Sequence, residues 1–337
     1  MNNDYEIDFV ITWVDGNDEK WQQEKNKYLK NTLNDNKKND TVRYREWDNL
    51  KYWFRAVEKF TPWVNKIYFV TYGHIPKWLN VDNPKLIIVN HKDYIPEEYL
   101  PTFSSHPIEF NIHRIKDLSE HFVYFNDDMF ITNYMTKNDF FKRGLPRDIA
   151  VIQPVTNKGE NNAFPHILLN NMRIINNHFS KKNVIKKNVT KWFNPIYGLS
   201  NFKSFFNYMG SSIFSGFLIP HIPTSYLKSS FNELWNKEFD IFNSTCLNKF
   251  RNNGDINHFV IAYYQMCQGK FYPRSRRIGK YFSISNNNKK ICDAIKNKKY
   301  KLICLNDIDD TINYEKARDE VNSAFNEILP EKSSFEL

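Results

Sequence analysis

Short apolar runs alternate with helical patterns along the first 150 residues, and this alternation limits the fold more than any other feature. The segment 47–60 has large apolar residues every three to four positions, which predicts an amphipathic helix. A second helix is predicted over 107–118, with Pro107 as its first residue. Four runs have the length and composition of buried strands: Ile7–Val14, Lys66–Tyr72, Lys85–Asn90 and Phe122–Phe125. This order predicts an α/β fold, Rossmann-like, with a partly parallel central sheet and flanking helices.

The second half of the chain is richer in helical patterns, asparagine, lysine and aromatic residues. We divide the sequence into an α/β half over 1–155, a helical half over 156–312 that completes the same domain, and a C-terminal helix and tail over 313–337. Ile149–Val155 is expected to be a further strand, and the tail from Glu331 is expected to fray.

Composition excludes several classes of protein. Aromatic residues make up 16% of the chain, which argues against disorder. No apolar run reaches the roughly 18 to 20 residues that span a bilayer, and the N-terminus has no signal-peptide pattern. The four cysteines show no CxxC spacing, so free thiols in a reducing compartment are expected. The net charge of +9 is typical either of a solvated basic surface or of an anionic partner.

Acidic turns follow two of the predicted strands. Asp15-Gly16 comes after the first strand, and Asp127-Asp128 comes after the fourth. Ligands of open α/β sheets bind at the carboxyl ends of the strands. Two adjacent carboxylates there suit Mg²⁺ or Mn²⁺, which take their remaining ligands from substrate phosphates and water. The alternative is that these residues form ordinary turns or a helix N-cap.

Three further residues are candidates for phosphate chemistry. His221 lies between two prolines, which suits either a positioned acid or base or a packed loop. Arg251 has the planar guanidinium that binds phosphate oxygens in pairs, although most arginines lie on the surface. Glu109 lies near the start of a predicted helix, where the helix dipole favours an acidic residue in any case.

Long motifs in the sequence resemble those of the Stealth family. The motifs are IDFVITWVDGND, DNLKYWFRAVEKFTPWVNKIYFVTYGHIPKWL and LPTFSSHPIEFNIHRIKDLSEHFVYFNDDMFI, and they lie within two of the family's four conserved regions. PHIPTSYLKSSF with the later Arg251 resembles the third region, and ICLNDIDD resembles the fourth. This sequence departs from the family at Phe103–Pro107, where the family more often has Asn and Ala before Ile-Glu.

The resemblance implies a sugar-1-phosphate transferase. Such an enzyme would move hexose- or N-acetylhexosamine-1-phosphate from a UDP-sugar to a glycan hydroxyl. It would release UMP and form a phosphodiester in a capsular or cell-surface polysaccharide.

The resemblance also implies roles for individual residues. The catalytic residues would be Asp128, His221 and Arg251, with either His221 or Asp128 as the base, and Asp127 and Asp128 would hold the metal. The remaining positions would bind the nucleotide-sugar (Trp13, Asp15, Gly16, Arg55 and Glu109) or close the site from the fourth region (Asn306 and Asp307).

The expected surroundings follow from this reaction. UDP-sugars are made in the cytoplasm, so we expect a cytoplasmic protein, with a glycan acceptor carried on a lipid and peripheral association with the inner membrane face. The basic stretches Lys181–Lys191 and Pro273–Lys280 are where a polyanionic product would lie, although a solvated surface explains them equally well. The sequence leaves the oligomeric state open.

Three other functions are compatible with the residues. A metal-dependent glycosyltransferase would use the same acidic pair but would release UDP. A nucleic-acid-binding protein would combine the positive charge with aromatic stacking, but no nucleic-acid motif is present, and we expect no nucleic-acid partner. A non-catalytic scaffold would leave the acidic pair without a role.

Overall fold

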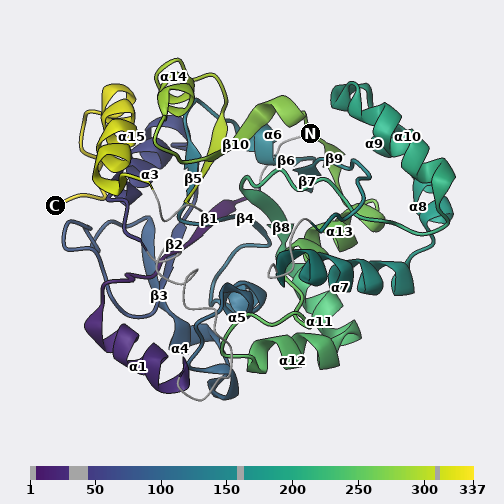
Figure 1. The fold of residues 1–337 in the computed structure, drawn as a ribbon, viewed down its shortest axis with the longest axis horizontal. Coiled ribbons are helices and arrows are strands. Elements are labelled where there is room, and N and C mark those ends of the chain that lie inside the picture. The colour runs from purple at the N-terminus through teal and green to yellow at the C-terminus, as the bar shows by residue number, and fades with distance from the viewer. Residues whose placement is uncertain (1–4, 30–44, 158–162, 308–311) are drawn as a thin grey trace.

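The computed structural model describes residues 5–29, 45–157, 163–307 and 312–337. Its centre is a five-stranded sheet in the order β3-β2-β1-β4-β8, in which the first four of these strands run parallel and β8 runs antiparallel to β4 (Figure 1). The strands are β1 (Ile7–Thr12), β2 (Ile67–Thr71), β3 (Leu86–Asn90), β4 (His121–Phe125) and β8 (Thr224–Leu227). The predicted partly parallel α/β sheet is confirmed.

Two smaller sheets extend this framework. The order β10-β11-β5 forms one, with β10 (Gly279–Ser283), β11 (Leu302–Asn306) and β5 (Met129–Ile131). The order β6-β7-β9 forms the other, with β6 (Phe141–Lys142), β7 (Leu145–Asp148) and β9 (Tyr272–Pro273). Both contain strands from the two halves of the sequence, as does the central sheet, because β8 pairs with β4.

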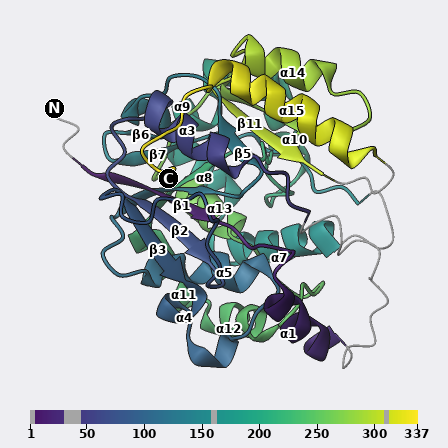
Figure 2. The same ribbon diagram turned by 90° about the vertical axis from the view of Figure 1, so that its left-hand side faces the viewer.

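Helices cover both faces of the central sheet (Figure 2). One face carries α3 (Leu50–Phe60), α14 (Lys289–Lys296) and α15 (Tyr314–Ile328). The other face carries α5 (Ser105–Asn111), α7 (Ala163–His178), α11 (Lys228–Lys237), α12 (Phe239–Leu247) and α13 (Phe259–Cys267). The remaining helices are α1 (Glu19–Leu29), α4 (His91–Tyr94), α6 (Lys137–Phe140), α8 (Lys181–Lys187), α9 (Val189–Trp192) and α10 (Ser200–Gly210). Short 3₁₀ turns lie at Glu97–Tyr99, Ile112–Arg114, Pro195–Tyr197 and Arg276–Ile278.

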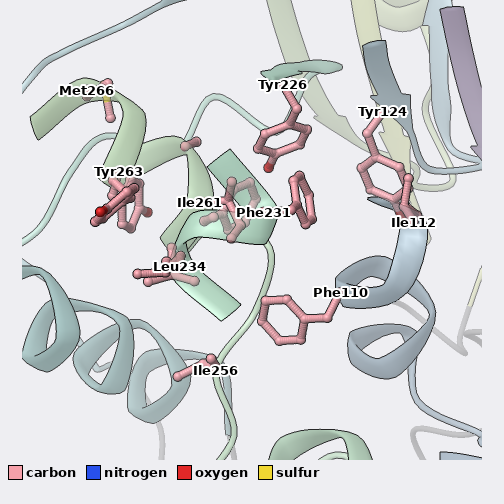
Figure 3. Close-up of a cluster of buried hydrophobic side chains, with 14 of the residues drawn as sticks. Phe110, Ile112, Tyr124, Tyr226, Phe231, Leu234, Ile256, Ile261, Tyr263 and Met266 are labelled. Atoms are coloured by element: carbon pink, nitrogen blue, oxygen red, sulfur yellow. The ribbon is translucent and has the colours of Figure 1, made fainter. Parts of the chain in front are cut away.

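The apolar runs become central strands because each face of the sheet has its own core. Side chains alternate along a strand, so Phe9 and Ile11 enter the core under α3 while Val10 enters the core on the opposite face. A strand covered on both sides is apolar at nearly every position, which is the near-continuous pattern of the sequence. The exception in β1 is the buried Asp8, whose carboxylate accepts from the backbone N–H groups of Lys66 and Ser119. Figure 3 shows part of the core on the face opposite α3, where side chains from β4, β8, α5, α11 and α13 meet.

The segment Ile149–Val155 differs from the strand that the sequence predicts. It runs beside residues 215–218 through backbone hydrogen bonds, but only Ile152 and Phe217 form a regular bridge. Gly216 makes this close approach, because a Cβ there would lie 2.4 Å from the carbonyl oxygen of Gln153. The segment is apolar because Ile149–Ile152 are buried in the same core as residues of α7 and α13, although the segment forms no regular strand.

Two predicted helices and the tail also differ in their ends. The helix expected over 47–60 begins at Leu50, and the one expected over 107–118 begins at Ser105 and tightens into a 3₁₀ turn at Ile112. Ser104, not Pro107, sets its start, since the Ser104 hydroxyl accepts from the backbone N–H of His106. The C-terminal tail does not fray: Phe335 is buried, and Glu336 bridges to Leu79.

Among the described residues, no helix has the length and apolar content needed to cross a bilayer. The four cysteines are all free thiols.

Candidate active site

The two acidic turns lie next to each other at the carboxyl edge of the central sheet. Strands β1 and β4 are parallel neighbours with Ile11 opposite Phe125, so the segments that follow them leave the sheet side by side. Across this edge the hydroxyl of Tyr124 lies 3.1 Å from Thr12 Oγ1. The two acidic turns therefore follow neighbouring strands at one edge of the sheet, and ligand binding at this edge stays a prediction.

Asp128 is held in place by β11. Its backbone carbonyl accepts from the N–H of Leu305 at 2.8 Å, and its Oδ2 accepts from the thiol of Cys304 at 3.2 Å. Its Oδ1 is buried and has no hydrogen-bond partner. Burial raises the pKa of Asp128 to about 6, although the Cys304 hydrogen bond opposes this shift.

Asp127 is open to solvent but crowded by protein and by other carboxylates. Desolvation by the surrounding protein, followed by the charges of Asp128 and Glu46, raises the pKa of Asp127 to about 7. Burial likewise raises the pKa of Glu46, with smaller contributions from Asp15 and Asp48. A bound cation would reduce the repulsion among these carboxylates and would give the unpaired oxygen of Asp128 a partner.

The turn after β1 presents its backbone toward the same region. The indole N–H of Trp13 donates to Glu46 Oε2 at 3.2 Å, and the backbone N–H of Asp15 donates to His74 Nε2 at 2.7 Å. Gly16 is buried, and its carbonyl accepts from the side chain of Gln22. The turn is therefore fixed by α1 and by the loop after β2, which holds Trp13 and Asp15 at the sheet edge.

A cationic cluster lies on the α5 side of Tyr124. The Tyr124 hydroxyl is 2.7 Å from Asn126 Oδ1 and 3.4 Å from Glu109 Oε1. Burial opposes the charge of Glu109, but its interactions with His258, His106 and Arg251 outweigh burial and lower the pKa of this carboxyl. Burial also lowers the pKa of His258, so Arg251 is the lasting positive charge of this cluster.

Arg251 reaches this cluster from the loop after α12. Its Nη2 donates to Ser105 Oγ at 3.1 Å, at the start of α5. His106 pairs with Asp255 at 3.2 Å. Ser105 and His106 both belong to Phe103–Pro107, where the sequence departs from the family pattern, so this segment holds Arg251 and its loop.

His221 lies on the same side of the site. Its backbone has φ of +45°, and its ring packs against those of Phe164, Phe259 and Tyr281. Burial lowers the pKa of His221, which keeps the imidazole neutral at pH 7. Tyr281 also connects it to the fourth region, because Asn306 Nδ2 donates to the Tyr281 hydroxyl at 2.6 Å.

Two predicted residues have other partners. Arg55 makes four hydrogen bonds, all to the C-terminal segment: two to the Glu336 carboxylate and one each to the carbonyls of Leu329 and Pro330. The structure does not bring Arg55 to the acidic pair, because this buried ion pair holds its guanidinium against the tail. Asp307 forms an ion pair with Arg45 at 3.2 Å.

Several residues of the site carry no signal in the sequence. Glu46, His106 and His258 are isolated polar residues in loops or helix starts, and Tyr124 looks like any other aromatic residue of a strand. The one usable signal is Asn126, which directly precedes the acidic pair and whose side chain accepts from Tyr124.

The acidic pair fits a divalent cation of the magnesium type. In the described ranges no three His, Cys, Asp or Glu side chains gather as a preformed metal cage. Mg²⁺ does not need such a cage, because one or two carboxylates suffice when phosphates and water complete its shell. The buried, unpaired Oδ1 of Asp128 is the atom best placed to bind it.

Comparisons with known proteins fix the family. Residues 5–32 match the model of Stealth protein CR1, conserved region 1, and residues 43–148 match Stealth protein CR2, conserved region 2. The sequence is 47% identical to a capsular polysaccharide phosphotransferase WcwK of Streptococcus pneumoniae, over 100% of this chain and 99% of that protein. The chain belongs to the Stealth family.

Other relatives of this Stealth protein match it from end to end. An exopolysaccharide phosphotransferase cps2G of Lactiplantibacillus plantarum is 41% identical over 98% of this chain and 96% of the relative. A receptor polysaccharide phosphotransferase WefC of Streptococcus oralis is 38% identical over 98% and 99%. The Stealth protein described here is accordingly an enzyme of the phosphotransferase class.

Among solved structures, the galactosyltransferase LgtC shows a distant likeness. It has 9% sequence identity and a TM-score of 0.36, with 94% of this chain and 95% of LgtC covered. The α/β assignment of the Stealth protein rests on its own sheet.

Proposed function

We propose that this enzyme transfers a sugar-1-phosphate from a UDP-hexose or UDP-N-acetylhexosamine to a hydroxyl of a glycan, releasing UMP. The product is a phosphodiester within a capsular or other cell-surface polysaccharide. The names of the full-length relatives support phosphate transfer onto polysaccharide. The acceptor is carried on a lipid at the inner membrane face, in the cytoplasm where UDP-sugars are made.

One observation carries the proposal: Tyr124 separates an acidic group of side chains from a cationic one at the carboxyl edge of the sheet. The acidic side is Asp127 and Asp128, and the cationic side contains Arg251. A nucleoside diphosphate sugar needs both, because its charge is compensated by a cation and by arginine while phosphorus changes partner.

The residues divide the chemical work as follows. Asp127 and Asp128 would hold Mg²⁺ or Mn²⁺, which, when bound, neutralises the diphosphate. Arg251 binds the phosphoryl group that is transferred and favours the charge that develops on it. Trp13, Asp15 and Gly16 bind the uridine end, and Glu109 orients Arg251 and the sugar.

His221 is the general base of the proposed reaction. Its imidazole is neutral at pH 7 because burial lowers its pKa, so it accepts the proton of the acceptor hydroxyl. The acceptor oxygen bonds to the phosphorus that carries the sugar, and the bond from this phosphorus to the bridging oxygen breaks. UMP then leaves with the electron pair of that bond.

Product analysis tests the proposal directly. The enzyme is incubated with a panel of UDP-sugars, Mg²⁺ and a glycan primer, and the nucleotide product is identified. We expect UMP together with a ³¹P signal of a phosphodiester. Release of UDP with no phosphodiester would instead make the protein a glycosyltransferase.

Single substitutions then test the roles. We expect Asp128→Asn, His221→Gln and Arg251→Ala each to lower kcat at least a hundredfold, since each removes a group that acts in the transition state. Lys290→Gln, on the exposed side of α14, serves as the control and should retain full activity. Near-normal UMP release by all three variants would contradict the assignment.

A further inference from the structure

Helix α10 is oriented with its apolar side toward solvent. Ser200 and Ser204 face inward and are only 3% and 1% exposed, while Phe202, Phe206 and Met209 are 64%, 70% and 68% exposed. These three lie at a helical spacing of three to four residues, so they share one face. Surface helices of soluble proteins place their apolar face toward the core, and α10 does the opposite.

The apolar surface extends beyond the helix itself. Leu199 and Ile213, at its two ends, are also exposed, as is Phe205. The serines on the inner face are anchored: the Ser204 hydroxyl accepts from the backbone N–H of Ile152, and the Ser200 hydroxyl accepts from Arg276. The outward direction of the phenylalanines is therefore fixed by the fold. An apolar patch of this kind marks a binding surface.

The charge around the patch indicates what binds there. From residue 161 to residue 232 the chain has eight Lys or Arg and not one Asp or Glu. Lys186 and Lys187 are exposed on α8, whose Lys181 packs on α10 by donating to the carbonyl of Asn207. Lys203 lies on α10 itself. An apolar helix face in a stretch of chain that has lysines and no acidic residues complements an anionic lipid surface.

A basic cavity adjoins the amino end of α10. It has a volume of about 350 Å³ and is lined by Ile196, Arg274, Arg277, Lys298 and Lys299, among others. Arg274 is almost completely buried, and its Nε and Nη1 have no hydrogen-bond partner. The carboxylates of Asp148 and Asp139 interact with this guanidinium, but burial still lowers the pKa of Arg274, so they compensate its charge only in part. A lipid phosphate has the charge and geometry to accept from the two free donor atoms.

We propose that α10 and the neighbouring basic residues dock the enzyme on an anionic phospholipid bilayer. Phe202, Phe206 and Met209 enter the interfacial region, Lys186 and Lys187 contact headgroups, and the cavity around Arg274 holds a lipid phosphate. One amphipathic segment alone binds membranes only weakly, so the combination of apolar and basic groups is what gives stable binding. This deepens the proposed function, because it provides the surface from which a lipid-linked acceptor is reached.

Vesicle flotation without donor or acceptor tests the proposal. Vesicles of phosphatidylglycerol and phosphatidylcholine are compared with vesicles of phosphatidylcholine alone. We expect strong partitioning to the anionic vesicles, which weakens in 1 M salt. The double variant Phe202→Ser/Phe206→Ser should partition at least about tenfold less, because it loses the two phenyl groups that would enter the bilayer. Phe239→Ser, which removes an exposed phenyl group from α12, should change nothing.

The charged groups are tested in the same assay. Lys186→Gln/Lys187→Gln should lower partitioning roughly tenfold or more. Lys289→Gln/Lys290→Gln, which removes two adjacent exposed lysines from α14, is the matched control. Arg277→Gln should also weaken binding, whereas millimolar inorganic phosphate should compete only in part.

Three results would overturn the proposal. Equal binding to neutral and anionic vesicles would remove the role of charge. Unchanged vesicle binding by Phe202→Ser/Phe206→Ser, combined with conversion of a dimer to a monomer, would assign the patch to a second copy of the chain. Complete displacement by inorganic phosphate would reduce the cavity to a free-phosphate site. None of these results depends on UMP release, so the proposed docking surface and the proposed reaction are tested independently.

Discussion

In the candidate active site a single hydroxyl lies between the acidic pair and the side that contains Arg251. Tyr124 comes from a central strand, and its oxygen lies within 3.4 Å of Thr12, Asn126 and Glu109. Its ring is buried and packs against His258, so the tyrosine is held firmly. We expect it to set the distance between the carboxylates and the guanidinium of Arg251.

Tyr124→Phe keeps the ring and removes only this oxygen. We expect kcat to fall about tenfold, with the free energy of unfolding lower by about 1 to 2 kcal/mol, because buried acceptors lose their donor. Tyr68→Phe is the matched control, since the hydroxyl of this β2 residue donates to the carbonyl of Asp117, in the turn before β4. Loss of activity by both variants would show a general effect on packing.

Two buried histidines make the stability depend on pH. Burial lowers the pKa of His91 and of His113 to about 3, with the charges of His74 and Arg114 as smaller causes. In the unfolded chain both would titrate near 6.5. Below pH 6.5 the unfolded chain therefore takes up protons that the folded chain does not, and stability falls by about 1.4 kcal/mol per pH unit for each histidine.

His91→Gln should remove one of these two contributions. Between pH 6.5 and 5.0 we expect the free energy of unfolding in urea to fall about 2 kcal/mol less in this variant than in the native chain. His166→Gln, which changes an exposed histidine, should reproduce the native pH dependence. A His91→Gln variant with the native pH profile would show that this imidazole is already charged in the folded protein.

At the scale of elements, the irregular pairing of 149–155 with 215–218 depends on one glycine. Gly216 has φ of +146°, and a Cβ there would lie 2.4 Å from the carbonyl oxygen of Gln153. Gly216→Ala should lower the free energy of unfolding by about 2 to 3 kcal/mol, because backbone strain adds to the clash. Gly254→Ala, where a Cβ meets nothing closer than 3.4 Å, should cost less than about 1 kcal/mol in thermal or urea unfolding.

The elements that the sequence predicts well are those whose pattern is local. Strands β1, β2 and β4 are mostly apolar because both faces are covered, and α3 shows its helical period directly. Strand β8 is short, and its place beside β4 depends on a partner about one hundred residues earlier in the chain. The same holds for β5 and β11, whose pairing no local pattern indicates.

The candidate site divides in the same way. Asp15, Asp127 and Asp128 follow strands, so the topology alone brings them to one edge. Arg55 lies in a family motif but has its partners in the C-terminal segment, which only the tertiary fold reveals. His106 and His258 were missed because their role comes from the charge of Glu109, and this neighbour is distant in sequence from His258.

At the scale of the molecule, the C-terminal segment is attached to α3 by an ion pair. Glu336 and Arg55 form a buried ion pair at 2.7 Å. Glu336→Ala should lower the free energy of unfolding by about 3 kcal/mol, since it leaves a buried guanidinium without its counter-ion. Glu327→Ala, which breaks an exposed pair with Lys296, should change it by less than about 1 kcal/mol.

A substitution of Arg55 itself tests the role of this residue. If Arg55 acts only on stability, Arg55→Lys should unfold more readily in urea while KM for the UDP-sugar stays constant. A rise in KM without a loss of stability would instead support the predicted role of Arg55 in binding the nucleotide-sugar.

The pairing of Asp128 with β11 has a consequence for biosynthesis. The thiol of Cys304 that binds Asp128 lies 176 residues later in the chain. At the usual bacterial rate of about 5 to 20 residues per second, the ribosome adds Cys304 roughly 9 to 35 seconds after Asp128. During this interval the acidic pair has no supporting strand, and the nascent enzyme has no complete catalytic edge. The edge of the sheet that carries Asp128 is therefore completed only after β11 has left the ribosome.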